Sequence, residues 1–345
     1  MPRASLIYLL SRARAIQADS ITPPRIQALL NALNLTEIKA ILEETVLKPY
    51  IESWDPENDP LSKLDTSLRS YYEDLLYGFM VGTDEKTANI IKPYLRFLEA
   101  ENVKIIMKAL YHNVDHDVVI PLIATSKHRP LSYYQRILDN ESFEIAPDYV
   151  TDPIIRNTLL QIIEKERDDI DKLTLYTDLF LDRVILEKTP LYGTDYLEEN
   201  FYRNALLIMR TLQAKISLKE IGLPLYPSHF QEYLQQAMHM ESATEAFYVF
   251  DQQTPIGEIY AAEEGIPPED PYKLLEELEL IIKRHLMKKS LSKFNISEDK
   301  EKSLIGFINM KRNELEDIIR IANGIHHHLD PDKIKSELIR FQFTH

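Results

Sequence analysis

The sequence contains no cysteine and only eight glycines among its 345 residues. Without cysteine the chain has no disulfide bond, no thiolate nucleophile and no cysteine-ligated zinc, which agrees with a cytoplasmic location. Phosphate-binding loops need closely spaced glycines, because backbone N–H groups must approach the phosphates. No Walker-type loop and no GxGxxG, HExxH or GxSxG pattern occurs. The sequence therefore offers none of these nucleotide-binding or hydrolase motifs.

Long apolar runs and an excess of positive charge are also missing. No stretch approaches the roughly 18 uncharged apolar residues of a membrane-spanning helix, so we expect none. The 55 Asp and Glu residues outnumber the 40 Lys and Arg residues, which gives a net charge of −15. Nucleic acid is not an expected partner, because phosphate binding requires a basic surface. Such a charge favours a basic protein surface as partner, or a contact in which the acidic face points to solvent.

The composition favours an all-α protein of more than one domain. Helix-forming residues dominate, and no alternating strand pattern persists for more than a few residues. Hydrophobic residues make up 44% of the chain, which is enough to bury real cores. Because 345 residues exceed the roughly 250 to 300 at which a single core stops growing, we expect two or three domains.

A helical block occurs three times, in the same part of each third of the sequence, at residues 94–109, 196–211 and 307–322. An offset of 102 residues superimposes six identical residues of the first two copies: Tyr94, Leu95, Asn102, Ile106, Met107 and Leu110 on Tyr196, Leu197, Asn204, Ile208, Met209 and Leu212. An offset of 213 aligns the third copy with fewer matches. Part of this similarity follows from the helical period alone. We predict three helical domains, at residues 1–115, 116–226 and 227–345.

Each third begins with short helices and proline-containing loops and ends with long helices. The long helical patterns lie at residues 64–111, with a break near residue 82, and at residues 154–187, 194–215, 272–291 and 298–327. Acidic loops are predicted at residues 54–62 and 252–271, and their role is not assigned.

Each repeated helix carries a polar residue within its apolar stripe. These residues are Asn102, Asn204 and Lys311, the last with Glu314 one helical turn away. A polar residue in a packed stripe more often fixes register than binds a ligand. Lys311 and Glu314 could pair on an exposed face, or Lys311 could point inward or toward an interface. We predict that Asn102, Asn204 and Lys311 occupy equivalent places in three related domains.

Histidine clusters offer weak candidates for a metal site. Residues 326–328 are three consecutive histidines, but neighbours on a helix point about 100° apart and cannot share one ion. His112 and His116 have a usable helical spacing, yet no paired Glu-x-x-His on a second helix completes a site. We therefore expect no metal, no cofactor and no catalytic residue. A helical metalloenzyme that uses His112, His116 or His229 remains an alternative.

Several motifs together resemble a known family. They are Tyr94-Leu-x-x-Leu-Glu-x-Glu-Asn, Asn204-x-x-x-Ile-Met-Arg210 and Phe307-x-x-x-Lys311-x-x-Glu314 with Gly324 following, supported by Tyr8-x-x-Ser-Arg-x-Arg14. This pattern is similar to the C subunit of archaeal and bacterial A/V-type rotary ATPases, the counterpart of the d subunit of eukaryotic V-ATPases. The resemblance covers the entire chain.

The resemblance implies a funnel of three similar helical domains around a pseudo-threefold axis. It also implies a non-catalytic rotor subunit on the cytoplasmic face of the membrane. Its partners would be the central-stalk subunits and the membrane proteolipid ring, and it would transmit torque between ATP chemistry and proton or sodium transport. The main alternative is a helical-repeat adaptor that binds a partner helix in an open groove and belongs to no rotary motor.

Overall fold

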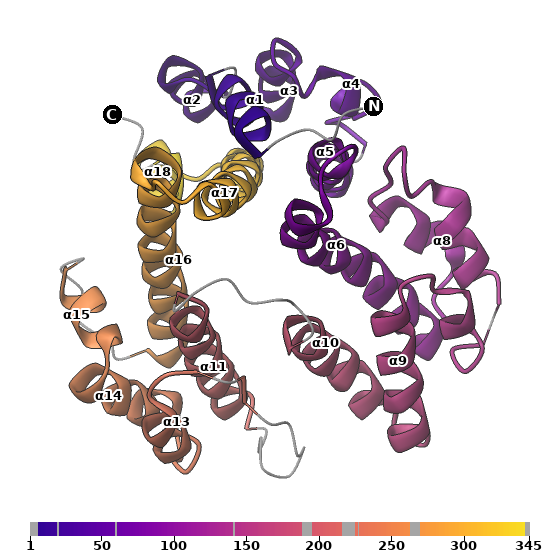
Figure 1. The fold of residues 1–345 in the computed structure, drawn as a ribbon, viewed down its shortest axis with the longest axis vertical. Coiled ribbons are helices and arrows are strands. Elements are labelled where there is room, and N and C mark those ends of the chain that lie inside the picture. Colours follow the sequence, from indigo (N-terminus) through magenta and orange to yellow (C-terminus); the bar gives the residue numbers. More distant parts are fainter. Residues whose placement is uncertain are drawn as a thin grey trace. The chain divides into compact units, whose positions relative to one another are not determined.

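The computed structural model confirms the all-α prediction (Figure 1). It describes residues 6–18, 21–58, 61–140, 142–187, 195–215, 225–226, 228–262 and 270–341. Within these ranges every regular element is an α-helix or a short 3₁₀-helix. None of the helices in these ranges is long and apolar enough to cross a membrane.

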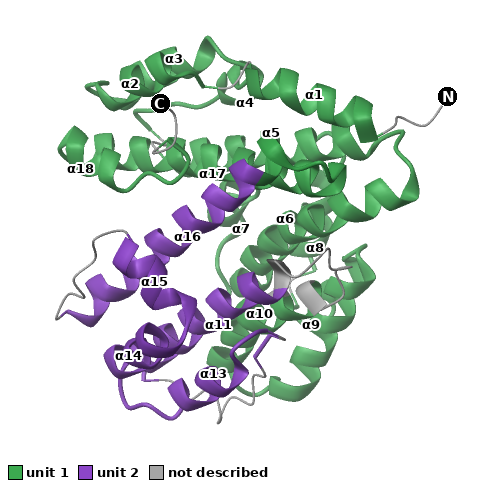
Figure 2. Cartoon of the chain, turned by 60° about the vertical axis from the view of Figure 1, so that its left-hand side comes forward, with its two compact units in different colours: residues 1–190, 293–345 green, residues 191–292 purple. Residues whose placement is uncertain are grey.

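The chain separates into two compact units (Figure 2). Unit 1 comprises Met1–Pro190 and Lys293–His345, and unit 2 comprises Leu191–Ser292. The C-terminal segment therefore packs with the N-terminal half of the chain. Three domains defined by the sequence repeat remain a prediction, since packing and sequence similarity divide a chain by different criteria.

Unit 1 begins with four short helices: α1 (Leu6–Ala18), α2 (Pro23–Leu30), α3 (Leu35–Glu43) and α4 (Lys48–Ile51). Proline at the start of α2 suits a first helical turn, where no N–H donor is needed. The side chain of Asn34 accepts from the Glu37 N–H at 3.0 Å, and the Glu37 carboxylate accepts from the Leu33 N–H at 2.9 Å. This reciprocal capping fixes the start of α3.

Two long helices follow, α5 (Ser62–Met80) and α6 (Glu85–His112). The predicted break between them is present. Gly82 there has a φ of +80°, a backbone conformation that glycine adopts without strain. The Asp84 carboxylate then accepts from the Thr87 N–H at 2.7 Å and begins α6. Asn113, in the left-handed conformation, ends α6.

The middle of the chain adds short elements and two further helices to unit 1: α7 (His116–Val119), η1 (Ile120–Leu122), α8 (Leu131–Leu138), η2 (Ala146–Tyr149), α9 (Pro153–Glu166) and α10 (Ile170–Glu187). The single helix predicted over 154–187 is wrong, because it is divided between α9 and α10. The carboxylate of Asp169 accepts from the Lys172 N–H at 3.0 Å and begins the second helix. Helix α10 packs against α6 and α9.

Helix α17 (Lys300–His326) and the short α18 (Pro331–Ser336) complete unit 1. Helix α17 packs against α1 and α5, although more than 200 residues separate it from them. The rings of Phe79 and Phe307 lie 5.5 Å apart, and the Tyr72 hydroxyl donates to the Ile308 carbonyl oxygen at 3.2 Å. These buried contacts connect the last third of the chain to the first.

Unit 2 consists of α11 (Asp195–Gln213), α13 (Gln231–Ala237), α14 (Ala243–Gln253), α15 (Pro255–Ala262) and α16 (Pro271–Ile296) up to Ser292. Its aromatic core contains Phe201, Phe247 and Phe250, all fully buried. The predicted acidic loop at 252–271 is wrong in part, since only Thr254 separates the end of α14 from Pro255, which begins α15. Residues 263–269 of this predicted loop lie outside the described residues.

The close approach of α15 to the end of α14 generates a stability prediction. A Cβ atom on Gly257 would lie 2.0 Å from the backbone carbonyl oxygen of Asp251. We expect Gly257→Ala to lower the free energy of unfolding by about 1–3 kcal/mol through overpacking, although alanine is the better helix former. Chemical denaturation followed by circular dichroism measures this change.

Gly78→Ala is the matched control. There the added Cβ would meet, at 3.0 Å, the flexible end of the Arg12 side chain. We expect this variant to stay within about 1 kcal/mol of the wild type. Equal stability of the two variants would show that α15 tolerates a larger residue at position 257.

Candidate functional site

The polar residue in the apolar stripe of α6 binds a later part of the backbone. Asn102 is 1% exposed. Its Nδ2 donates to the Ala124 carbonyl oxygen at 2.7 Å, and its Oδ1 accepts from the Ala124 N–H at 3.0 Å. Both backbone groups of one residue are thus satisfied by a single side chain. This contact ties the chain after η1 to the middle of α6.

The corresponding residue of α11, in unit 2, makes the same contact. Asn204 is fully buried, its Nδ2 donates to the Tyr226 carbonyl oxygen at 2.9 Å, and its Oδ1 accepts from the Tyr226 N–H at 2.9 Å. The amide of Asn204 also lies 3.1 Å from the Ser228 hydroxyl. We call such a side chain a tether, because it holds the backbone of a later residue by hydrogen bonds. In both helices the tethered residue follows the asparagine by 22 positions. The contact of Asn102 in unit 1 thus recurs in unit 2, 102 residues later in the sequence.

In α17 an aspartate makes the corresponding contact. Asp317 is fully buried and accepts from the N–H groups of Ile339 at 2.8 Å, Arg340 at 2.6 Å and Phe341 at 3.0 Å. Ile339 again follows the tethering residue by 22 positions. Burial raises the pKa of Asp317, and the three amides and the Arg320 guanidinium oppose that rise. These hydrogen bonds align Asn102 with Asp317, an offset of 215 residues.

Lys311 and Glu314 make a different contact in α17. Their side chains are almost completely buried, and Lys311 Nζ lies 2.8 Å from Glu314 Oε1. Glu314 also helps, after burial itself, to raise the pKa of Tyr71 on α5. A buried ion pair gains little net stability, but removal of one partner leaves an uncompensated charge. The sequence predicted that Lys311 is equivalent to Asn102 and Asn204, whereas in α17 the contact that those asparagines make is made by Asp317.

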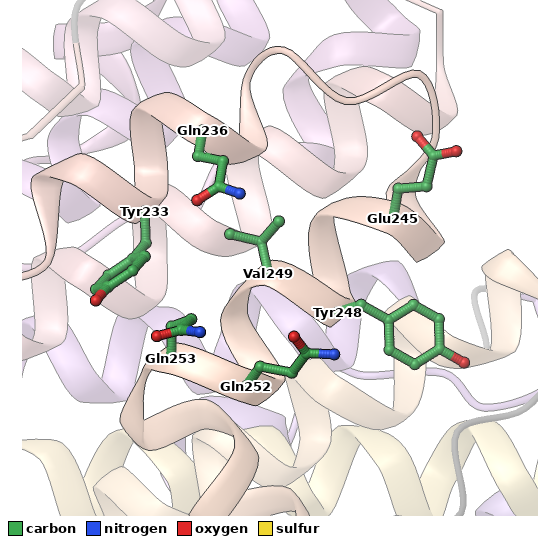
Figure 3. Close-up of a pocket in the computed structure, with 7 residues that line it drawn as sticks. All are labelled: Tyr233, Gln236, Glu245, Tyr248, Val249, Gln252 and Gln253. Carbon is green, nitrogen blue, oxygen red and sulfur yellow. The ribbon is translucent and has the colours of Figure 1, made fainter.

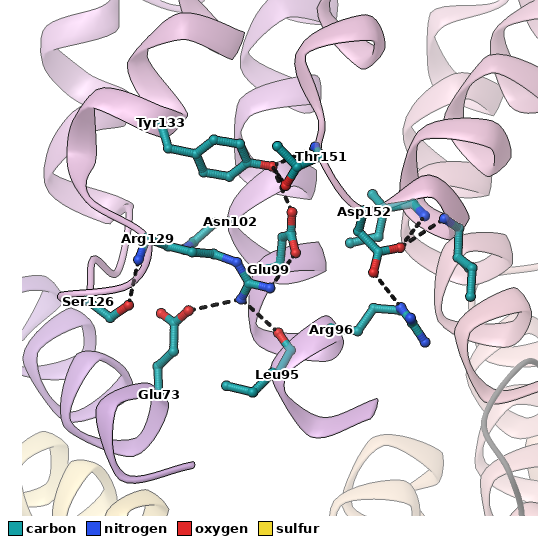
Figure 4. A network of polar contacts seen from close by, with 12 residues as sticks. Glu73, Leu95, Arg96, Glu99, Asn102, Ser126, Arg129, Tyr133, Thr151 and Asp152 are labelled. Atoms are coloured by element: carbon teal, nitrogen blue, oxygen red, sulfur yellow. Dashed lines mark hydrogen bonds and ion pairs between the residues drawn. The ribbon is translucent and has the colours of Figure 1, made fainter. Parts of the chain in front are cut away.

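A network of buried polar side chains lies between α5, α6 and α8 (Figure 4). Arg129 is at its centre. Its Nη1 lies 2.9 Å from Glu73 Oε1 and donates to the Leu95 carbonyl oxygen at 3.1 Å, and its Nη2 lies 2.5 Å from Glu99 Oε2. Glu73 and Glu99 are each 1% exposed. One guanidinium therefore pairs with buried carboxyl groups from two different helices.

The network continues to the start of α9. Glu99 Oε1 accepts from the Tyr133 hydroxyl at 2.7 Å, and the Tyr133 oxygen accepts from the Thr151 N–H at 3.0 Å. Next to it, Arg96 Nε lies 2.7 Å from Asp152 Oδ2. The other Asp152 oxygen accepts from the first N–H groups of α9 (Figure 4). Charged side chains of α6 thus position the start of α9.

The two carboxylates of this network have altered proton affinities. Burial raises the pKa of Glu73 to about 7, although the Arg129 guanidinium opposes the rise. Burial also raises the pKa of Glu99. Paired carboxylates can perform acid–base catalysis when one of them faces a substrate. Here each carboxylate is closed off by hydrogen bonds to its own protein, which indicates a structural role.

The Arg129 network was not predicted from the sequence. Glu73, Glu99 and Arg129 are separated by 26 and 30 residues, and each looks like an ordinary surface charge. A weak signal was available, since Glu73 lies between Tyr72 and the apolar positions of α5, on the buried face.

The candidate metal ligands are not brought together. His112 Nε2 lies 3.2 Å from the Thr174 hydroxyl, and His116 Nδ1 lies 3.8 Å from Asp139 Oδ1. The rings of His326 and His327 contact each other with centroids 5.0 Å apart. Over the residues that the structure describes, no group of three or more histidine or carboxylate side chains could hold a metal ion.

The tether of α17 generates a second stability prediction. In Asp317→Asn one acceptor oxygen becomes an NH₂ donor, which would face backbone N–H groups that the carboxylate now satisfies. We expect the free energy of unfolding to fall by roughly 1–3 kcal/mol. The control is Asp332→Asn at an exposed position of α18, which should change stability by less than about 0.5 kcal/mol. Equal effects of the two substitutions would contradict a stabilising role of the tether.

The raised pKa of Glu73 predicts a pH-dependent effect. A carboxyl group whose pKa is higher in the folded than in the unfolded state stabilises the fold fully below its unfolded pKa. This stabilisation is lost as the pH rises through the folded value of about 7. Glutamine resembles the protonated form and keeps no such dependence. The difference in unfolding free energy between Glu73→Gln and the wild type should therefore shift by about 2 kcal/mol in favour of the variant from pH 5 to pH 8.

Unfolding free energies of both proteins at pH 5 and pH 8 provide the measurement. Glu57→Gln, in an exposed turn, is the matched control and should differ from the wild type by the same small amount at both pH values. A pH-independent difference for Glu73→Gln would show that Glu73 remains ionised in the folded protein throughout this range.

The sequence matches a known protein family over most of its length. Residues 9–337 match the family described as the ATP synthase (C/AC39) subunit. No curated individual protein gives a significant match. The match covers nearly the full sequence and confirms the resemblance to the C subunit of A/V-type rotary ATPases. The chain belongs to the family of ATP synthase (C/AC39) subunits.

Proposed function

We propose that this chain is a non-catalytic rotor subunit of an A/V-type ATPase, which joins the central stalk to the membrane proteolipid ring and transmits torque between them. Its membership of the ATP synthase C/AC39 family carries this proposal. The buried charged groups of α5, α6 and α17 support it, because their hydrogen bonds end on other parts of the same chain. As a peripheral protein it would lie on the cytoplasmic face of the membrane.

We further propose that the three thirds of the sequence, residues 1–115, 116–226 and 227–345, are related domains arranged as a pseudo-threefold funnel. The recurrence of the tether supports this arrangement, since Asn102, Asn204 and Asp317 each bind backbone 22 residues later. In this proposal Asn102 and Asn204 are structural positions. Lys311 and Glu314 form an additional buried pair that belongs to the third domain.

Helix pairing gives independent support for related domains. In unit 1, Lys108 of α6 pairs with Asp178 of α10 at 3.0 Å. In unit 2, Arg210 of α11 pairs with Glu279 of α16. Arg210 follows Lys108 by 102 residues, and its partner follows Asp178 by 101 residues. In both cases the last long helix of one third pairs with a long helix of the next.

The pairing of α17 supports the rotor proposal over the adaptor alternative. Helix α17 is the last long helix of the last third, and it packs against α5, the first long helix of the first third. An open superhelical adaptor has no such contact, because each of its repeats contacts only its sequence neighbours. A ring of three domains requires it.

Torque transmission explains why such a subunit would contain so many buried polar contacts. Force applied at one domain reaches the next only if the connecting segments do not yield. Side chains such as Asn102 and Arg129 hold these segments at several points, and their loss would leave buried polar groups unpaired. Stiffness of this kind requires no catalytic residue.

The proposal predicts uncoupling when the subunit is absent. An A/V-type complex assembled without this chain should still hydrolyse ATP in its head, while ATP-driven ion transport into vesicles falls to background. Addition of the purified chain should restore transport, and the purified chain alone should show no ATP turnover. Unchanged transport without the chain, or failure of the chain to bind both stalk and ring in pull-down experiments, would contradict the proposal.

A further inference from the structure

A groove in unit 2 lies between α13 and α14 and has no role in the contacts described above (Figure 3). Its volume is about 320 Å³. It is lined by two aromatic, three amide, one acidic and one aliphatic side chain: Tyr233, Tyr248, Gln236, Gln252, Gln253, Glu245 and Val249. The groove is large enough for one long side chain and open to solvent.

Aromatic rings lie on both sides of the groove. In the view of Figure 3, Tyr233 and Tyr248 are on opposite sides, with Gln236 and Val249 between them. Tyr248 is 48% exposed, so its ring is accessible from solvent. Each glutamine side chain offers a carbonyl oxygen that can accept from a donor in the groove. The lining therefore combines π faces with hydrogen-bond acceptors.

The chain segment that forms the groove carries acidic side chains and no Lys or Arg. Residues 220–272 contain ten Asp and Glu residues and no Lys or Arg. On the described helices and turns of this stretch, Glu232, Glu241, Glu245 and Glu258 are exposed. An anionic ligand would find no Lys or Arg in this stretch, whereas a cation would be attracted to it.

Glu245 is held at the rim by helix capping. The Ser242 hydroxyl oxygen accepts from the Glu245 N–H at 3.2 Å, and the Glu245 Oε2 accepts from the Glu241 N–H at 3.0 Å. This reciprocal pair fixes the first turn of α14 and the carboxylate with it. The negative charge at the rim is therefore positioned before any ligand arrives.

We propose that this groove binds an arginine side chain from a basic segment of a partner protein. A guanidinium stacks on tyrosine rings, donates five N–H groups to acceptors such as glutamine carbonyls, and pairs with a carboxylate. Charge complementarity identifies the partner as basic, and the exposed ring of Tyr248 offers a face on which a flat guanidinium can stack. The inference does not depend on the rotor proposal, because every residue of the groove lies within unit 2.

Binding can be measured by methyl NMR on the full-length chain with labelled valines. The probe is an acetylated, amidated pentapeptide with two arginines separated by glycines, and the reference peptide carries citrulline in place of arginine. We expect the arginine peptide to shift the Val249 methyl signals and to leave those of Val118, an exposed valine of unit 1, unchanged. Added salt should weaken the binding, because exposed charges are screened.

Two substitutions test the chemistry of the groove. Tyr248→Ala should weaken binding of the arginine peptide about fivefold, which corresponds to a cation–π contact at an exposed site. Glu245→Gln retains a side chain that can cap α14 and should weaken binding about threefold through loss of charge alone. Glu276→Gln, an exposed position of α16 that does not line the groove, is the charge-matched control and should leave affinity unchanged.

Four outcomes would overturn the proposal. They are a Val249 signal that does not respond to the arginine peptide, an equal response to the citrulline peptide, equal effects of Glu245→Gln and Glu276→Gln, and a stronger response to spermidine than to the peptide. The last result would assign the groove to a small polycation instead of a protein segment.

Discussion

The structure depends on one recurring requirement, that backbone polar groups buried beside a long helix must find hydrogen-bond partners. An unpaired buried N–H or carbonyl group costs about as much as a lost hydrogen bond. In α6, α11 and α17 a polar side chain in the middle of the helix meets this requirement for a segment that returns 22 residues later. The helix can then be covered by irregular chain, which apolar packing alone would not allow.

Buried charged side chains also find partners within the protein, in places where helices from different parts of the sequence meet. Arg129 follows η1 and satisfies carboxylates on both α5 and α6, while Lys311 and Glu314 neutralise each other inside α17. Such pairs add little net stability compared with apolar residues of the same size. The contacts of Arg129 do specify which helices meet, since a shifted register would leave a buried charge without its partner. For a subunit proposed to carry torque, specificity of this kind matters more than maximal stability.

The all-α fold and most of the long helices could be predicted from the sequence, because apolar periodicity and capping residues act locally. The alignment of Asn102 with Asn204 was also accessible, since identical residues surround both asparagines. The tether at Asp317 was not, because few identities survive in the third copy and an aspartate there resembles a surface charge. The Arg129 network and the packing of α17 against α5 depend on contacts between residues far apart in sequence. Periodicity within one helix contains no information about such contacts.

The tether in α17 is an aspartate, whereas those in α6 and α11 are asparagines. This difference follows from the backbone groups that each side chain binds. Asn102 and Asn204 bind the N–H and the carbonyl oxygen of a single residue, which requires one donor and one acceptor on the side chain. Asp317 binds three successive N–H groups, which converge only where the backbone bends, and Ile339 and Arg340 lie in such a bend. Three donors require a side chain that only accepts, and a carboxylate has two acceptor oxygens and no donor when ionised. The chemical difference among the three copies therefore reflects a difference in local backbone shape, while the function of the tether stays the same.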